Sequence, residues 1–181
     1  MKEVKLHLGC GWRNFGKDWL HVDDGDYEHL DIKCNVAKLE LPDNYADLIY
    51  ASHVIAYFDR AEILDVLKEW YRVLKPGGTL RLATPDFEAM SMLYVRGLPL
   101  SKILGPMYGK MPMDKFTIYH KTVYDFKSLE EVLLSSGFKN VNKYDWQQTE
   151  HSQFDDHSQA YIPHMDKDDG VLISLNVECI K

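Results

Sequence analysis

The sequence predicts an α/β fold in three layers, with a mostly parallel central sheet whose last strand runs antiparallel. Short β-prone segments alternate with helical patterns along most of the chain, which is typical of a parallel sheet covered on both faces. Two strand candidates near the end, residues 140–144 and 171–179, are not separated by a clear helical pattern. The final strand is therefore expected to run antiparallel, because a parallel connection usually needs a helix.

Short β-prone runs provide seven strand candidates. They are Val4–Leu8, Trp19–Val22, Leu30–Ile32, Leu48–Tyr50, Thr79–Ala83, Asn140–Tyr144 and Val171–Cys179. The third is unusual, because few residues separate Asp24 from Leu30, whereas a parallel crossover usually needs about a dozen. Either the helix after the second strand is missing or the third strand is vestigial.

The clearest helix is predicted between the fourth and fifth strands. Asp59 and Glu62 have the spacing of a capping box, with Asp59 as the N-cap. Apolar residues then recur at helical spacing as far as Leu74. A proline and two glycines within Lys75–Gly78 end the helix.

Two further helices are predicted on shorter patterns. One begins at Ser128, which has Glu131 three residues further on. It ends at Gly137, because glycine is typical of the position just after a helix. The other covers Phe87–Arg96.

Length and composition indicate one globular domain. The 181 residues suit a single domain over 1–181, within which we expect an inserted helical lobe at 86–126 and an acceptor loop at 145–170. No apolar run approaches the roughly 18 residues of a membrane span, and the first residues lack the apolar core of a signal peptide. Three distant cysteines without a CxxC pair predict free thiols, a cytoplasmic protein and no zinc site.

The net charge of −7 limits the classes of partner. It disfavours nonspecific binding to nucleic acid or to an anionic membrane, so we expect neither as a partner. A small-molecule partner is compatible with this charge, including an anionic one that is recognised locally. The sequence leaves the oligomeric state open.

Two glycines one residue apart follow the first predicted strand. Gly9 and Gly11 are small enough for a ligand to approach the backbone closely, although many turns contain Gly-x-Gly. The dinucleotide fingerprint needs a further glycine near position 14, where this chain has Asn14. This difference argues against a nicotinamide or flavin dinucleotide.

Two carboxylates follow the second predicted strand. Asp23 and Asp24 are either part of a solvated turn or accept hydrogen bonds from the hydroxyls of a ribose. Their position after the strand that follows the Gly-x-Gly segment favours the ribose. Asp23 is preferred, because it directly follows the apolar run.

These motifs together resemble those of the class I S-adenosylmethionine-dependent methyltransferases. Leu6–Trp12 resembles the family's first motif, and Asp23 stands where the family has its ribose-binding acid. Asp47–His53 is similar to the fourth-strand motif, and Arg72–Leu80 to the helix, turn and fifth strand. The resemblance covers Val4–Asp86 well and the rest by the order of elements. More narrowly, the chain is similar to small bacterial methyltransferases of sugar or cell-surface polysaccharide pathways.

The resemblance implies a Rossmann-like sandwich and S-adenosylmethionine as the cofactor. It also implies a set of cofactor-binding residues around the first, second, third and fourth strands. They are Gly9, Cys10, Gly11, Trp12, Asp23, Asp24, Asn35, Val36, Ser52 and His53. The chain departs from the family at Arg13, which replaces a third glycine, and at Asn35, where an acid is common. It also has Ala56-Tyr57 where relatives often carry Glu-His.

A base is needed if the methyl acceptor is an oxygen or a protonated nitrogen. His53 is placed by its motif, and His120 precedes the Ser128 helix at the same expected edge of the sheet. His157 lies in the polar segment Thr149–Met165, which joins the last two strands. Each histidine could equally be a hydrogen-bonded structural residue. The segment could be a plain solvated loop or hold a metal, but no HExxH pattern is present and we expect no metal.

Polar and aromatic side chains near these histidines are the candidate acceptor contacts. They are Tyr57, Asp86, Tyr119, His120, Tyr124, His151 and Tyr161. For Tyr57, packing at a strand–helix junction is an equally good interpretation.

The sequence therefore predicts methyl transfer from S-adenosylmethionine to a small-molecule acceptor, with a sugar or polysaccharide precursor as the preferred class. Two alternatives stay open. One is a catalytically inactive, cofactor-binding partner subunit, suggested by the departures at Arg13, Asn35 and Ala56-Tyr57. The other is an aminopropyl transferase, which uses a similar sheet but usually carries further acids around the reacting amine.

Overall fold

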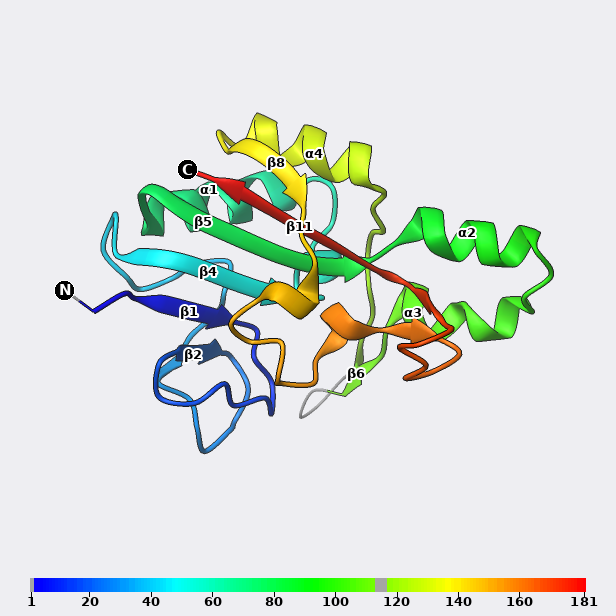
Figure 1. Ribbon diagram of the computed structural model, residues 1–181. Coiled ribbons are helices and arrows are strands. Elements are labelled where there is room, and N and C mark those ends of the chain that lie inside the picture. Colours follow the sequence, from blue (N-terminus) through cyan, green and yellow to red (C-terminus); the bar gives the residue numbers. More distant parts are fainter. Residues whose placement is uncertain (1, 113–116) are drawn as a thin grey trace.

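A seven-stranded sheet forms the centre of the molecule in the computed structural model, which describes residues 2–112 and 117–181 (Figure 1). The strand order is β3-β2-β1-β4-β5-β11-β8. In chain order the strands are β1 (Lys5–Leu8), β2 (Leu20–Asp23), β3 (Ile32–Lys33), β4 (Ala46–Ser52), β5 (Leu74–Pro85), β8 (Lys139–Lys143) and β11 (Ser174–Ile180).

The strand directions confirm the predicted fold class. β1 to β5 pair in parallel, whereas β11 runs antiparallel to both β5 and β8. The β11–β5 ladder is long, with Ser174 opposite Pro85 and Ile180 opposite Thr79. The run predicted at 171–179 is interrupted, since Val171–Leu172 (β10) forms a separate antiparallel hairpin with Tyr161–Ile162 (β9).

The third strand is reduced and the helix before it is missing, so both alternatives left open by the sequence apply. β3 has two residues, and no helix forms within residues 9–31, all of which the structure describes. The connection after β1 is therefore an extended loop. Within this loop, the backbone amide of Gly11 points to the carboxylate of Asp23 at the end of β2.

Two helices cover one face of the sheet: α1 (Ile63–Val73) and α4 (Phe126–Ser135). Their apolar stripes pack against Leu6, Leu8 and the inward side chains of β4, β5 and β11 in the main core. This burial removes a large apolar area from water, which is the dominant favourable term in folding. α1 and α4 lie on the same side of the sheet in Figure 1.

The helix ends agree with the sequence in part. The predicted capping box is present, since the Glu62 amide donates to Asp59 (3.1 Å) and the Asp59 amide donates to Glu62 (3.1 Å), one turn ahead of α1. The predicted start of α4 at Ser128 is wrong. Asp125 is the N-cap, and Ser128 is the third helical residue of its capping box. Gly137, with φ +101°, follows the end of α4 as predicted.

Aromatic side chains cover the other face of the sheet. Phe15 and Trp19 from the loop after β1 pack on Leu48 and Tyr50 of β4, with Phe154 beside them. The segment between β8 and β9 completes this layer. It contains two short 3-10 turns, η3 (Trp146–Gln148) and η4 (His157–Gln159). Loops with large side chains therefore form the third layer here.

A smaller lobe extends from the end of β5. It contains α2 (Phe87–Val95), η2 (Leu100–Lys102), α3 (Leu104–Tyr108) and the hairpin of β6 (Met111–Pro112) and β7 (Thr117–Ile118). α2 confirms the predicted helix over Phe87–Arg96. The lobe packs on the 160–173 segment through Met90, Ile103 and Ile173. Residues 113–116 of the predicted 86–126 lobe lie outside the described residues. As functional units, the lobe and the 145–170 acceptor loop remain predictions.

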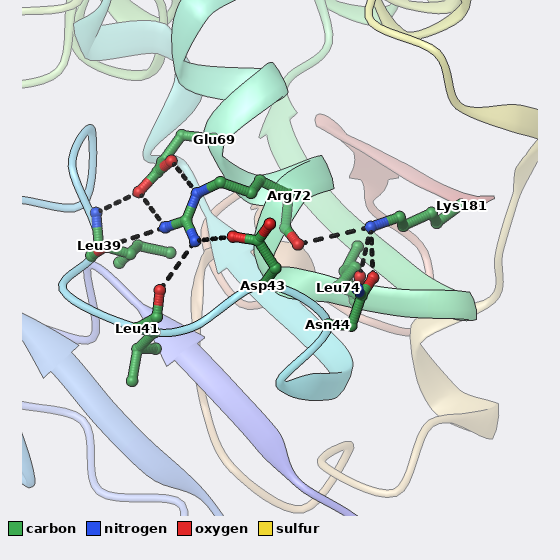
Figure 2. Close-up of polar contacts among 8 residues, drawn as sticks. All are labelled: Leu39, Leu41, Asp43, Asn44, Glu69, Arg72, Leu74 and Lys181. Carbon is green, nitrogen blue, oxygen red and sulfur yellow. Dashed lines mark hydrogen bonds and ion pairs between the residues drawn. The ribbon is translucent and has the colours of Figure 1, made fainter.

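A polar network holds the connection before β4 against α1 (Figure 2). The Arg72 guanidinium pairs with Asp43 (2.6 Å) and Glu69 (2.8 Å), and it also donates to the carbonyls of Leu39 and Leu41. Lys181 donates to the carbonyl of Leu74 (2.7 Å) at the end of α1, where a cation is favoured. Within the part of the chain that the structure describes, no helix is long and apolar enough to cross a membrane.

Candidate functional site

Asp23 links two glycine turns at the carboxyl edge of the sheet. The amide of Gly11 donates to one carboxylate oxygen (2.9 Å), and the amide of Gly25 donates to the other (2.8 Å). A carboxylate offers about four acceptor positions, so each oxygen can accept a further hydrogen bond. Asp23 is half-buried and can therefore still face a ligand.

The two glycines of the first motif have different surroundings. Gly11 has φ +56°, and a side chain added there would meet nothing within 4 Å, so the space above this turn is open. Gly9 has φ +61°, and an added Cβ would lie 2.5 Å from a methyl carbon of Val54. Gly9 is therefore needed both for its left-handed backbone and for its close packing against the segment after β4.

The end of β4 supplies a polar atom without a partner. The Ser52 hydroxyl is buried, and it has no hydrogen-bond partner among the residues described. A buried polar group normally has one, so this hydroxyl is suited to contact a bound molecule. Together with the carboxylate of Asp23 and the open turn at Gly11, this group fits a nucleoside ligand at the carboxyl edge, where ligands bind in open α/β sheets.

The remaining predicted cofactor residues lie around this edge in different environments. Burial raises the pKa of Cys10 to about 12, so it is a neutral thiol and not a nucleophile at neutral pH. Trp12 is 68% exposed, and Asp24 is exposed. The side-chain oxygen of Asn35 accepts from the Ala37 amide (2.8 Å). The Val36 carbonyl accepts from the Trp70 indole (2.8 Å).

Three histidines predicted as catalytic candidates lie close together. The ring centroids of His53 and His157 are 5.0 Å apart, and those of His53 and His120 are 6.3 Å apart. His53 directly follows β4 with φ +57°, and His157 opens η4. His120 lies ahead of α4, with one ring nitrogen 3.1 Å from the Met107 carbonyl. The structure thus brings side chains from three distant segments to one edge of the sheet.

These rings are neutral at neutral pH. Removal from water, together with the neighbouring His157 and His120, holds the pKa of His53 well below its usual value of 6.5. Burial also lowers the pKa of His120. A neutral imidazole has one nitrogen free to accept a proton, as a general base requires.

A buried network fixes His157 in place. Asp156 accepts hydrogen bonds from the Tyr50 hydroxyl and from the Ser158 amide (2.8 Å), and it caps the turn that begins at His157. Asn176 of β11 donates to the Ser158 carbonyl (2.9 Å). Sequence patterns gave no signal for this network, because it joins β4, η4 and β11 across the sheet.

The predicted acceptor contacts divide into two groups. Tyr57 lies edge-on to His120, with centroids 4.8 Å apart, and Tyr119 is its exposed chain neighbour. The other four residues have different contacts. Asp86 caps α2, and Tyr124 is part of the main core. His151 packs among the aromatic rings on the second face of the sheet, and the Tyr161 hydroxyl accepts a hydrogen bond from the Trp146 indole. The structure does not bring these four into the histidine cluster, and their contact with an acceptor stays a prediction.

Two residues of the site were not predicted as contributors. The Ser174 hydroxyl lies 3.4 Å from a ring nitrogen of His53. The expected antiparallel last strand could have predicted the position of Ser174. The first residue of such a strand lies at the edge where the parallel strands have their carboxyl ends. The other is Arg13, whose side chain reaches the backbone of Asp155.

Comparison with known proteins identifies a domain model and two relatives that match part of the chain. Residues 14–82 match the model of a family described as a methyltransferase domain. The ubiquinone/menaquinone biosynthesis C-methyltransferase UbiE of Neisseria gonorrhoeae is 30% identical over 122 residues, covering 58% of this chain and 44% of that protein. The same enzyme from Neisseria meningitidis is 29% identical over 119 residues, with equal coverage. The chain thus spans less than half the length of the curated relatives it matches.

Solved structures share the fold over nearly the whole chain. A SAM-dependent methyltransferase from Archaeoglobus fulgidus gives a TM-score of 0.60 at 15% identity, covering 99% of this chain and 86% of the other. Human N-acetylserotonin methyltransferase, in complex with SAM, gives a TM-score of 0.57 at 15% identity, covering 98% of this chain and 47% of the other.

Residues 14–82 are thus similar to a methyltransferase domain, and S-adenosylmethionine-dependent methyltransferases of known structure share the fold of the chain.

Proposed function

We propose that this protein transfers a methyl group from S-adenosylmethionine to a small-molecule acceptor. One observation carries the proposal. A single edge of the sheet holds a carboxylate suited to ribose hydroxyls, Asp23, next to an open glycine turn, and it also holds a cluster of neutral histidines. Cofactor recognition and proton removal are thus available side by side.

Each part of the edge has a separate task in this proposal. Asp23 accepts from the ribose hydroxyls, and the open turn at Gly11 lets the cofactor approach the backbone. When bound, S-adenosylmethionine supplies an electrophilic methyl group on a positively charged sulfur. His53 or His157 takes the proton of the acceptor's O–H or N–H group as its oxygen or nitrogen bonds to the methyl carbon. The electron pair of the broken carbon–sulfur bond remains on sulfur.

Positioning supplies much of the rate in such a reaction, because the leaving group is already good. The site has the means for it: Asp156 and its partners fix His157, and the Met107 carbonyl holds His120. Tyr57 and Tyr119 lie beside His120, where they can contact the acceptor.

For the acceptor, we propose a sugar or polysaccharide precursor as the first class to screen. Hydroxyl acceptors of this kind need a base, and the histidine cluster provides one. Quinone-like phenols are the second class, because the curated relatives are named for ubiquinone and menaquinone biosynthesis.

Calorimetric titration with S-adenosylmethionine, S-adenosylhomocysteine and NAD tests the cofactor assignment. Micromolar binding of the first two, without binding of NAD, is the expected result. No binding of either sulfur nucleoside would overturn the proposal. Preference for decarboxylated S-adenosylmethionine would instead favour an aminopropyl transferase, and binding without turnover on any screened acceptor would favour an inactive partner subunit.

A further inference from the structure

Arg13 stands where the first motif of the family usually has a glycine, and its backbone is fixed in place. Its amide donates to the Cys10 carbonyl (3.1 Å), and the His29 ring lies 3.0 Å from the Arg13 carbonyl. The side chain crosses to the segment between β8 and β9, where its Nε donates to the Asp155 carbonyl (3.0 Å). The guanidinium therefore lies between the cofactor loop and the turn that carries His157.

This guanidinium has no carboxylate partner in the described ranges, although the chain is acidic. Two other arginines that are similarly half-buried each pair with two carboxylates: Arg72 with Asp43 and Glu69, and Arg81 with Glu150 and Glu178. Only the Nε of Arg13 has a described hydrogen bond, and it goes to a neutral carbonyl. The two terminal nitrogens are left to form the planar fork that matches a carboxylate or a phosphate.

The surroundings of Arg13 favour an anion. Its Nε contacts the carbonyl of Asp155, two residues before His157, so the guanidinium lies at the turn that carries this ring. The histidines remain neutral and do not compete with Arg13 for a negative group. Asp155 and Asp156 are the acidic residues of the segment that Arg13 contacts. Asp156 is engaged by Tyr50 and Ser158, and Asp155 offers its backbone carbonyl to Arg13.

We propose that the two terminal nitrogens of Arg13 bind an oxyanion, a carboxylate or a phosphate, at the His53–His157 edge of the site. The inference rests on the proposed function and adds a specificity-determining residue to it. The oxyanion has two sources: the carboxylate of the methionine part of the cofactor, or an anionic group on the acceptor. In the first case Arg13 selects S-adenosylmethionine over its decarboxylated form. In the second case it selects acceptors that carry a carboxylate or a phosphate.

The first arm of the test compares two nucleosides that differ only in the carboxylate. Calorimetry measures binding of S-adenosylhomocysteine and of S-adenosyl-3-thiopropylamine to the wild type, Arg13→Gln and Lys17→Gln. Lys17 is the matched control, because it is an exposed cation of the same loop. If the cofactor is the source, the wild type prefers the carboxylated nucleoside by about tenfold or more, and Arg13→Gln loses this preference while Lys17→Gln keeps it.

The second arm titrates inorganic phosphate into the complexes with S-adenosylhomocysteine and follows the histidine ring signals by NMR. If the acceptor is the source, the wild type and Lys17→Gln show saturable shifts, and Arg13→Gln shows shifts weakened by about tenfold or more. An Arg13→Gln variant that matches the wild type in both arms overturns the proposal.

Two further results keep the test decisive. Wild-type protein that binds neither nucleoside refutes the proposed function, and phosphate titration of the free protein then decides the role of Arg13.

If Arg13→Gln fails to fold, Arg13→Lys is used, because it keeps the charge but lacks the fork. Binding weakened by about threefold or more in this variant supports the proposal, and unchanged binding in both arms overturns it.

Discussion

At the scale of single residues, Asp23 is the side chain on which cofactor affinity should depend most. We expect Asp23→Ala to weaken S-adenosylhomocysteine binding by about 1.5–3 kcal/mol, the range for hydrogen bonds to a charged group. Part of this loss comes from the freed amides of Gly11 and Gly25. Calorimetry gives the affinity, with the exposed neighbour variant Asp24→Ala as the control. Equal affinities for the two variants would move the ribose role away from Asp23.

The histidine cluster leads to a prediction on pH. Because the pKa of His53 lies well below 6.5, a base at this position stays neutral, and activity persists, to a lower pH than an ordinary histidine allows. We expect kcat/KM to be level from neutral pH to below 6.5, and to fall only as pH drops through the lowered pKa.

Substitution identifies which ring acts as the base. His53→Asn or His157→Asn should reduce kcat by about 10²–10⁴ if that ring accepts the proton, with little change in S-adenosylhomocysteine affinity. His164→Asn is the control, because this exposed histidine belongs to the same connecting segment as His157. His120→Asn is measured in the same way. If all three variants lose less than about tenfold in kcat, none of these histidines is the base.

The sequence predicted the location of those site residues whose place along a strand determines their place in the fold. Asp23 ends β2 and His53 directly follows β4, and these strands run parallel, so the two residues had to lie at the same edge of the sheet. The hydrogen bond between Tyr50 and Asp156, which fixes the turn at His157, could not be predicted from strand positions. It depends on how a long connection folds back over the sheet, and no periodic pattern encodes such a path.

At the scale of elements, the start of α4 shows how a cap can be misassigned. Ser128 followed by Glu131 has the spacing of a capping box, but Asp125 followed by Ser128 has a related pattern one turn earlier and forms the bonds. Aspartate and serine are both good N-cap residues, so composition alone did not separate the two starts.

Removal of this cap should destabilise the protein. We expect Asp125→Ala to lower the free energy of unfolding by about 1 kcal/mol, because the Ser128 amide loses its acceptor. For a chain of this size, this corresponds to a decrease of roughly 2–4 °C in Tm, measured by circular dichroism. Lys127→Ala is the control, at an exposed position in the same first turn. A cap variant as stable as this control would contradict the assignment of Asp125.

At the scale of the whole molecule, the two faces of the sheet are built differently. α1 and α4 cover one face with aliphatic packing, which their helical periodicity predicted. On the other face, Phe15 and His151 come from loops and pack with the rings of His7 in β1 and Tyr50 in β4. Side chains from loops carry no period, so the sequence predicted that this face is covered but not what covers it.

This aromatic layer should make the fold sensitive to acid. Burial lowers the pKa of His151 to about 4, although the nearby Asp156 raises it, and burial holds the pKa of His7 well below 6.5. The unfolded chain, with histidine pKa values near 6.5, binds more protons than the folded chain between pH 6.5 and 4. Stability should therefore be lost as pH falls through this window, on the order of 3 kcal/mol from His151 alone.

Replacement of His151 by phenylalanine isolates this effect. The His151 ring is fully buried, and neither of its nitrogens has a hydrogen-bond partner in the described structure, so Phe keeps the stacking on Tyr50 and removes the titrating group. We expect His151→Phe to be at least as stable as the wild type at pH 7 and to show a shallower loss of stability towards pH 4. Urea unfolding at a series of pH values measures this, with the exposed His164→Gln as the control. Parallel pH profiles for His151→Phe and the wild type would show that other groups, such as His7, carry the acid sensitivity.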